Sequence, residues 1–306
     1  MALDDQIPAY DPGFAVPDYR FDQKNEMFKR VLWDETVQHI GRRFYDDIRY
    51  SNNVGRRKLD FAFRGASWNT EWAHAGGLSR SNAGLYAWQG VCAKLERFAR
   101  TGSRVAASPA SLSRVIKRTG RFFGADLVGI CRLHPNWVYS HEFNTATREH
   151  YPHNVPAACN NAIVLAVAMD YEAMRSRSMV VEGAATGLGY SKMAFVADLM
   201  AAFIRALGYT AIPCGNDTAL SIPLAMAAGL GEAGRLGLLI TPAFGPRVRL
   251  CKVFTDLPLA HDRYQPFGAT RFCKTCMVCA KRCPSRAISL SCLWPPLSFW
   301  LWGSFF

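Results

Sequence analysis

The stretch SKMAFVADLMAAFIRALGYTAIPC, residues 191–214, decides the fold class of this chain. Its first part, residues 191–208, carries apolar side chains at a helical period, namely Val196, Leu199, Met200, Phe203, Ile204 and Leu207. This period predicts a helix with one buried face, and Gly208 suits the position just past its end. The next residues, YTAIPC, form a short apolar run that predicts a buried strand.

The same alternation of helix and strand extends on both sides of this unit. Ser108 followed by Pro109 is typical of a helix start, and apolar Leu112, Val115 and Ile116 continue that helix. Strands are predicted in 126–131, in 161–169 and, as two strands joined by a Pro/Gly turn, in 237–259. Alternation over residues 106–258 predicts a layered α/β or α+β domain. Residues 1–105 show no such order and predict loops and short helices.

Composition narrows the class of protein further. Half of the 306 residues are hydrophobic and the formal net charge is +12, but the basic residues are scattered. A basic yet ordinary surface is therefore predicted, with no nucleic acid as a partner. The first residues, MALDDQIPAYDPGF, carry neither a basic region followed by an apolar run nor a twin arginine, which predicts a cytoplasmic, reducing location. Five isolated cysteines are expected to be buried thiols: Cys92, Cys131, Cys159, Cys214 and Cys251.

A dense cysteine run, FCKTCMVCAKRCPSRAIS at residues 272–289, points to metal chemistry. The spacing Cys273-x2-Cys276-x2-Cys279-x3-Cys283-Pro is that of bacterial ferredoxins, in which thiolates hold 4Fe–4S clusters. Zinc is the alternative, but zinc sites usually bring a second ligand pair from a distance. Each cluster takes four thiolates, and only Cys292 lies beyond the run. The chain therefore supplies the ligands of one cluster at most.

The tail, residues 287–306, has no charged side chain and is about as long as the shortest membrane spans. Pro295-Pro296 interrupts it, and a helix interior tolerates proline poorly. A membrane span is therefore the less favoured reading of this segment.

Residues 106–289 closely resemble the reductive dehalogenases, the corrinoid- and iron–sulfur-dependent enzymes that remove halide from organohalides. The residues that carry the resemblance are GLGYSKMAFVADLMAAFIRALGYTAIPC, GNDTALS, GPRVRLCK and the cysteine run. The resemblance implies an α+β fold, with a nitroreductase-like corrinoid-binding core over 106–260. An incomplete ferredoxin-like segment would occupy 261–306, and residues 1–105 would form an irregular N-terminal region.

The resemblance also implies the chemistry and the site. A base-off corrinoid (cobalamin), reduced through 4Fe–4S clusters held by Cys273, Cys276, Cys279 and Cys283, would remove the halide. Tyr190 would donate the proton, Arg249 and Asn216 would act beside it, and Thr186 would contact substrate. A cation such as Arg249 would favour the phenolate and make Tyr190 a better acid. Read without the resemblance, Tyr190 is a turn residue at a strand edge and Asn216 a turn or helix cap.

Two departures from the family pattern bear on partners and location. The twin-arginine leader is not seen, and LSCLWPPLSFWLWGSFF stands where relatives carry a second cysteine run, which predicts a truncated C-terminus. Expected partners are an organohalide, an external electron donor (ferredoxin, flavodoxin or a membrane quinol chain) and a membrane anchor protein. If a leader was lost, the alternative location is membrane-associated, on the exported side, as organohalide respiration would require.

Other functions stay open on the sequence alone. An epoxyqueuosine reductase-like enzyme acting on transfer RNA is one alternative, although that family places an aspartate where Tyr190 stands. An inactive fragment or a ferredoxin-like electron carrier is another. GLGEAG, residues 229–234, matches a dinucleotide-binding pattern, but it comes after a helix-like segment instead of a strand. We expect its glycines to allow close backbone approach to the corrinoid ring. No histidine is expected to ligate cobalt: His39, His74, His134, His141, His150, His153 and His261.

Overall fold

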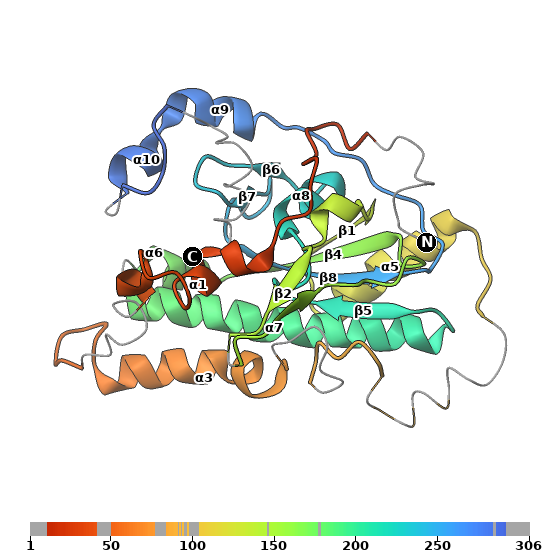
Figure 1. Cartoon of the computed structure of the whole chain (residues 1–306), viewed down its shortest axis with the longest axis horizontal. Helices are drawn as coiled ribbons and strands as arrows, with labels where there is room; N and C mark the ends of the chain where they lie inside the picture. Colours follow the sequence, from red (N-terminus) through yellow and green to blue (C-terminus); the bar gives the residue numbers. More distant parts are fainter. Residues whose placement is uncertain are drawn as a thin grey trace.

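A computed structural model describes residues 11–41, 50–76, 84–90, 104–145, 147–176, 179–283 and 286–291, with positions 92, 94 and 97. The predicted tail segment beyond residue 291, with Cys292, lies outside these residues. A four-stranded antiparallel sheet in the order β1-β4-β8-β5 forms the centre (Figure 1). The strands are β1 (Leu127–Arg132), β4 (Asn161–Ala168), β8 (Val248–Thr255) and β5 (Ala211–Cys214).

Both faces of this sheet are buried, which explains the unbroken apolar run that predicts β4. Ile163, Leu165 and Val167 alternate with Ala162, Val164 and Ala166 along the strand and enter two different core clusters. The first cluster lies under α5 (Pro109–Phe122) and α7 (Met179–Ala206), and the second under α8 (Ser221–Ala227). The layered α+β prediction is confirmed.

Helix α7 is longer than its sequence pattern indicates. It begins at Met179, so the GLGYSK segment lies inside the helix, and the reading of Tyr190 as a turn residue is wrong. The pattern hides this part of the helix because Gly183, Gly187 and Gly189 interrupt it, and glycine costs about 1 kcal/mol in a helix interior. Residues Val180–Ala206 are long and apolar enough to cross a membrane, yet 56% of the most apolar window is buried. Burial against the sheet accounts for that composition.

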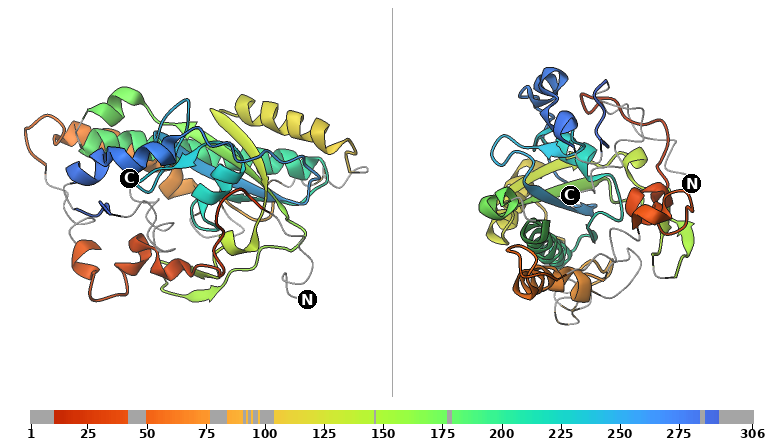
Figure 2. Two further views of the ribbon diagram at one scale, coloured as in Figure 1. Left: turned by 90° about the horizontal axis from the view of Figure 1, so that it is seen from above. Right: turned by 90° about the vertical axis from the view of Figure 1, so that its left-hand side faces the viewer.

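The N-terminal third contains a substantial helix that the sequence did not reveal. Helix α3 (Lys58–His74) lies along the outer side of α7, so that α7 is held between the sheet and α3 (Figure 2). Its inner side carries Arg64 and the Trp68 indole in place of an aliphatic stripe, which is why no apolar period predicts it. The short helices that precede it among the described residues include η2 (Gln23–Asn25) and α1 (Met27–Arg30).

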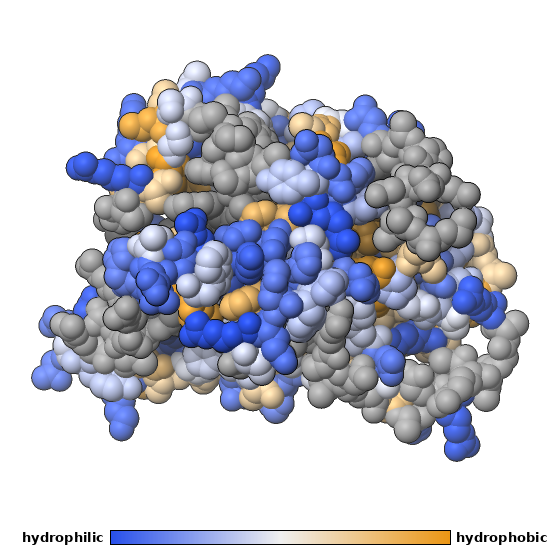
Figure 3. Space-filling view, in the orientation of Figure 1, coloured by the Kyte–Doolittle hydropathy of each residue, from blue (hydrophilic) through white to orange (hydrophobic). Residues whose placement is uncertain are grey.

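Smaller elements complete the described part of the fold. They are η3 (Pro135–Trp137), the hairpin β2 (His141–Phe143) and β3 (His150–Pro152), α6 (Tyr171–Arg175), and the hairpin β6 (Glu232–Ala233) and β7 (Leu239–Ile240). The cysteine run folds as α9 (Ala269–Cys276) and α10 (Val278–Arg282). Figure 3 shows apolar residues on the surface in the region of these helices. Phe272 and Val278 are exposed.

Three sequence predictions are settled by these elements. Two strands do form within 237–259, but they join different sheets, because β7 pairs with β6 and β8 pairs with β4 and β5. The predicted burial is confirmed for Cys131, Cys159, Cys214 and Cys251. It is wrong for Cys92, which is exposed.

Candidate active site

The structure brings Tyr190 and Asn216 into direct contact from two different elements. Tyr190 projects from α7, and Asn216 lies in the loop between β5 and α8. The Asn216 amide nitrogen donates to the Tyr190 hydroxyl oxygen over 2.7 Å. A phenol oxygen that accepts this bond keeps its own hydrogen for another partner.

Arg249 and Thr186 complete the group predicted from the sequence. The Arg249 guanidinium carbon lies 5.0 Å from the centre of the Tyr190 ring, and its Nη2 donates to Thr186 Oγ1 over 3.2 Å. Arg249 is on β8, and register turns it toward α7, the side that Cys251 and Val253 also face. All four residues therefore meet, although their individual roles remain predictions.

Trp68 also stacks on the tyrosine ring, and no motif in the sequence marks it. Its ring stacks on Tyr190 at 5.0 Å between centroids and 22° between planes, and on Trp72 at 5.4 Å. Its indole N–H donates to the Gly183 carbonyl over 2.9 Å. The only available signal was the i, i+4 spacing of the two tryptophans, which places them on one face of a helix.

The acidity of Tyr190 differs from the expectation. Burial raises the pKa of the Tyr190 phenol, and this exceeds the opposing effect of the Arg249 charge. Glu71, Glu26 and Asp217 add to the increase through their negative charges. Tyr190 is thus held in its protonated form at neutral pH, which is the form that a proton donor requires.

Lys252 fixes the loop that carries Asn216. It lies on β8 with no exposed surface and points away from Arg249, toward the α8 side of the sheet. Its ammonium donates to the Gly215 carbonyl, to the Ala219 carbonyl over 2.9 Å and to Ser221 Oγ over 2.8 Å. Ser221 Oγ in turn donates to Asn216 Oδ1 over 3.4 Å.

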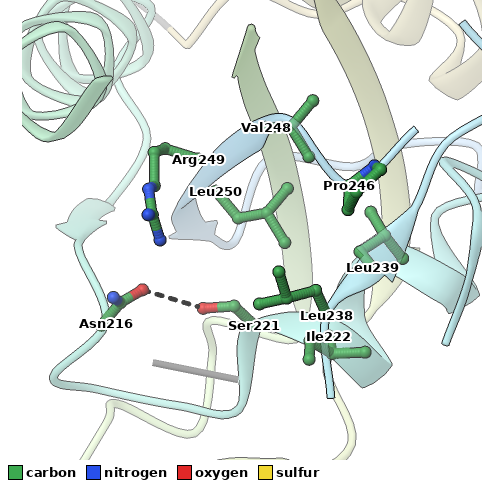
Figure 4. Close-up of a pocket in the computed structure, with 9 residues that line it drawn as sticks. All are labelled: Asn216, Ser221, Ile222, Leu238, Leu239, Pro246, Val248, Arg249 and Leu250. Carbon is green, nitrogen blue, oxygen red and sulfur yellow. Dashed lines mark hydrogen bonds between the residues drawn. The ribbon is translucent and has the colours of Figure 1, made fainter. Parts of the chain in front are cut away.

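Beside this group lies a small pocket that is open to solvent. Figure 4 shows Asn216 and Arg249 at one side of it and apolar side chains at the other. The lining residues are Asn216, Ser221, Ile222, Leu238, Leu239, Pro246, Val248, Arg249 and Leu250. The buried Arg249 Nε has no hydrogen-bond partner among the described residues, so this N–H suits an acceptor on a bound ligand.

Two further polar groups lie near the tyrosine, and no sequence motif marks either of them. Burial, and then the charge of Asp217, raises the pKa of Glu71 on α3 to about 8. Its buried Oε2 has no hydrogen-bond partner among the described residues, and neither has the hydroxyl of Tyr86. The Tyr86 hydroxyl lies against Gly215, where an added Cβ would come within 3.1 Å of it.

The GLGEAG glycines allow close backbone approach within the chain itself, and the expected approach to a corrinoid ring stays a prediction. A Cβ at Gly231 would lie 2.2 Å from the Ile240 carbonyl oxygen, and one at Gly229 would lie 2.8 Å from that of Arg263. Glycine is therefore needed where these backbones pass one another.

The adjoining side chains hold the cysteine segment. Glu232 accepts backbone N–H groups of Phe267 over 3.1 Å and Ala269 over 2.6 Å, at the start of α9. Arg235 is 3% exposed and donates to the carbonyls of Cys273 over 3.0 Å and Ser289 over 2.7 Å. Both ends of the cysteine run are thereby attached to the β6–β7 hairpin.

The four cysteines have the chemistry of a cluster site. Cys273 is buried, the other three are half-buried, and Met277 at φ 51° turns the chain sharply between α9 and α10. Burial raises the pKa of Cys279, with Cys273 adding to the increase and the Arg235 charge opposing it. Several thiols and a buried guanidinium in one place suit an anionic iron–sulfur cluster. Their role as ligands remains a prediction.

A second group with metal-ligand chemistry lies away from the pocket. Asp22, His141 and His150 place one ligand atom each within 4.8 Å of one another. His150 Nε2 lies 2.9 Å from an Asp22 carboxylate oxygen, and its ring stacks on His141 at 4.7 Å. These contacts fasten the N-terminal segment to the β2–β3 hairpin.

Curated proteins of one family resemble this chain over most of its length. A tetrachloroethene reductive dehalogenase of Dehalobacter restrictus is 39% identical over 241 residues, which cover 67% of this chain and 43% of that protein. One from Sulfurospirillum multivorans is 33% identical over 307 residues, covering 90% of this chain and 60% of that protein. The chain is a homologue of the reductive dehalogenases. No family model matches it.

Solved structures support the same relationship. The catabolic reductive dehalogenase NpRdhA has a TM-score of 0.65 at 28% identity over 89% of this chain and 36% of that protein. A reductive dehalogenase whose structure suggests a mechanism for B12-dependent dehalogenation has a TM-score of 0.64 at 28% identity, with the same coverage. The chain spans between 43% and 60% of the length of the two curated relatives named here.

Proposed function

We propose that this chain carries the catalytic core of an enzyme that reductively dehalogenates an organohalide. The supporting observation is the meeting of Tyr190, Asn216 and Arg249 beside a pocket whose other side is lined by apolar side chains. The chain is homologous to oxidoreductases that are named for tetrachloroethene, trichloroethene and chloroethene. A small chlorinated ethene is therefore the first substrate class to test.

The reaction takes up two electrons and one proton, replaces a carbon–halogen bond by a carbon–hydrogen bond and releases halide. No side chain is a strong enough reductant, so a cofactor must supply this step. A base-off corrinoid would provide a low-valent cobalt for it, and electrons would arrive through 4Fe–4S chemistry at Cys273, Cys276, Cys279 and Cys283. The nitroreductase-like core of 106–260 would hold the corrinoid, and the segment from 261 onward would hold the cluster.

In this proposal the chain itself manages the proton and the charges. Tyr190 donates its hydroxyl proton to carbon, and the Asn216 N–H then stabilises the phenolate that remains. The Arg249 guanidinium lies over the same ring and supplies positive charge, while its Nε, which has no hydrogen-bond partner among the described residues, suits the departing halide. Trp68 excludes water from one face of the ring. Thr186 orients Arg249, and its contact with substrate is part of the proposal.

The test is chloride release from tetrachloroethene by the chain reconstituted anaerobically with iron, sulfide and cobalamin, with reduced methyl viologen as electron donor. Tyr190→Phe should lower the rate by about 10²–10⁴-fold with cobalt content unchanged. Tyr171→Phe is the control, because Tyr171 is 54% exposed and lies outside the site. Full activity of Tyr190→Phe would refute the proton-donor role, and failure to bind cobalamin would refute the function.

A further inference from the structure

A continuous hydrogen-bond chain leads from a buried lysine to the tyrosine. Lys252 donates to Ser221, Ser221 donates to Asn216, and Asn216 donates to Tyr190, over 2.8, 3.4 and 2.7 Å. The links come from β8, α8 and the β5–α8 loop and end on α7. Ser221 ends the GNDTALS segment and Lys252 ends the GPRVRLCK segment, but neither residue has a role predicted from the sequence.

The direction of this chain is set by its first member. An ammonium group has three hydrogens and no lone pair, so Lys252 can only donate. Its three hydrogens are used by the Gly215 and Ala219 carbonyls and by Ser221 Oγ. Burial lowers the pKa of Lys252 to about 8, so the group still carries its charge at neutral pH.

Each later link inherits that direction. Because Ser221 Oγ accepts from Lys252, its own hydrogen is free to go to the Asn216 carbonyl oxygen. This assignment turns the amide nitrogen, a pure donor, toward Tyr190. A carboxamide without that constraint could present its oxygen instead, and the phenol would then donate to it.

We propose that Lys252 is a positioning residue that, through Ser221, keeps Asn216 a hydrogen-bond donor to Tyr190. The other cation beside the ring is Arg249, which also has no acceptor atom. Neither Asn216 nor Arg249 can therefore take the phenol hydrogen. The effect of this positioning on catalysis rests on the proposed function, whereas the direction of the hydrogen bonds from Lys252 to Tyr190 does not.

The decisive variant is Ser221→Ala, which breaks the hydrogen-bond chain and leaves Lys252 with its two carbonyl partners. Ser221→Thr keeps the hydroxyl and should restore the wild-type result. Ser191→Ala is the matched control, because Ser191 is a buried serine next to Tyr190 whose hydroxyl donates to the Ser67 carbonyl, outside the chain. Lys252→Met is a second variant that breaks the hydrogen-bond chain, to be used if it folds.

The direct readout needs no cofactor. An infrared difference spectrum at pH 7, wild type minus Tyr190→Phe with ring-labelled tyrosine, reports the phenol C–O stretch. That frequency is lower for a phenol that only accepts than for one that donates. We expect the accepting signature in wild type, Ser221→Thr and Ser191→Ala, and a donating signature in Ser221→Ala. A donating signature in wild type, or no change in Ser221→Ala, would overturn the proposal.

Activity supplies a second readout that separates this proposal from the function. A phenol hydrogen held by Asn216 must first be released, so Ser221→Ala should lower kcat about three- to tenfold, the worth of one hydrogen bond, with KM unchanged. If Ser221→Ala changes the infrared signature but the protein has no dehalogenase activity at all, the proposed function is refuted and the proposed direction of the hydrogen bonds stands. If the enzyme is active and Ser221→Ala leaves the infrared signature unchanged, the proposed function stands and the proposed role of Lys252 is refuted.

Discussion

Gly187→Ala tests the contact between α3 and α7 on which the tyrosine's environment depends. A Cβ built at Gly187 would lie 2.2 Å from Cδ1 and 2.4 Å from Nε1 of Trp68. The indole cannot swing aside cheaply, because it is stacked between Tyr190 and Trp72 and donates to the Gly183 carbonyl. The variant should therefore destabilise the protein even though alanine is the better helix former.

The magnitude of the effect is a balance of opposing contributions. Replacing a helical glycine by alanine favours folding by about 1 kcal/mol. Overpacking costs about 1–3 kcal/mol, and losing the indole hydrogen bond and the stack costs about 0.5–1.5 kcal/mol each. We expect a net loss of about 1–5 kcal/mol in the free energy of unfolding.

The assay is urea unfolding monitored by tryptophan fluorescence and by circular dichroism. Gly65→Ala on α3 is the matched control, because no atom lies within 4 Å of its added Cβ. The control should stabilise the protein by up to about 1 kcal/mol, the difference in helix propensity. If Gly187→Ala were as stabilising as Gly65→Ala, the packing of Trp68 on Tyr190 would be wrong.

Two more predictions concern charges on either side of the site. Between pH about 5 and 8 the native state keeps a proton on Glu71 that the unfolded chain has released, so stability should fall as pH rises, by at most about 1.4 kcal/mol per unit. Glu71→Gln should flatten that slope in urea unfolding from pH 5 to 8, and an unchanged slope would assign the pH dependence to other groups. Arg235→Met removes the donor to the Cys273 and Ser289 carbonyls. It should speed proteolysis after residue 268 and lower iron uptake with the sheet intact, whereas Lys274→Met, also in the cysteine segment, should do neither.

Much of the fold is readable from the sequence because it rests on local periodicity. β4, α5 and the second half of α7 bury apolar side chains at regular spacing. This spacing is visible in the sequence whichever elements those side chains pack against. The four residues Thr186, Tyr190, Asn216 and Arg249 were found through family resemblance, and the structure brings them together. Periodicity alone would have left Tyr190 in a turn.

Tertiary structure alone determines which groups from distant segments share one buried space. Trp68 and Glu71 reach the tyrosine because Gly183 and Gly187 let α3 lie close against α7, and the sequence pattern records those glycines only as interruptions. In the sequence, Lys252 is simply a residue within a largely apolar strand. Only the register of β8 in the sheet turns its side chain toward Ser221 and the Asn216 loop. The pKa of Tyr190 reflects burial outweighing a nearby cation, a balance between desolvation and Coulomb energy that exists only once the chain has folded.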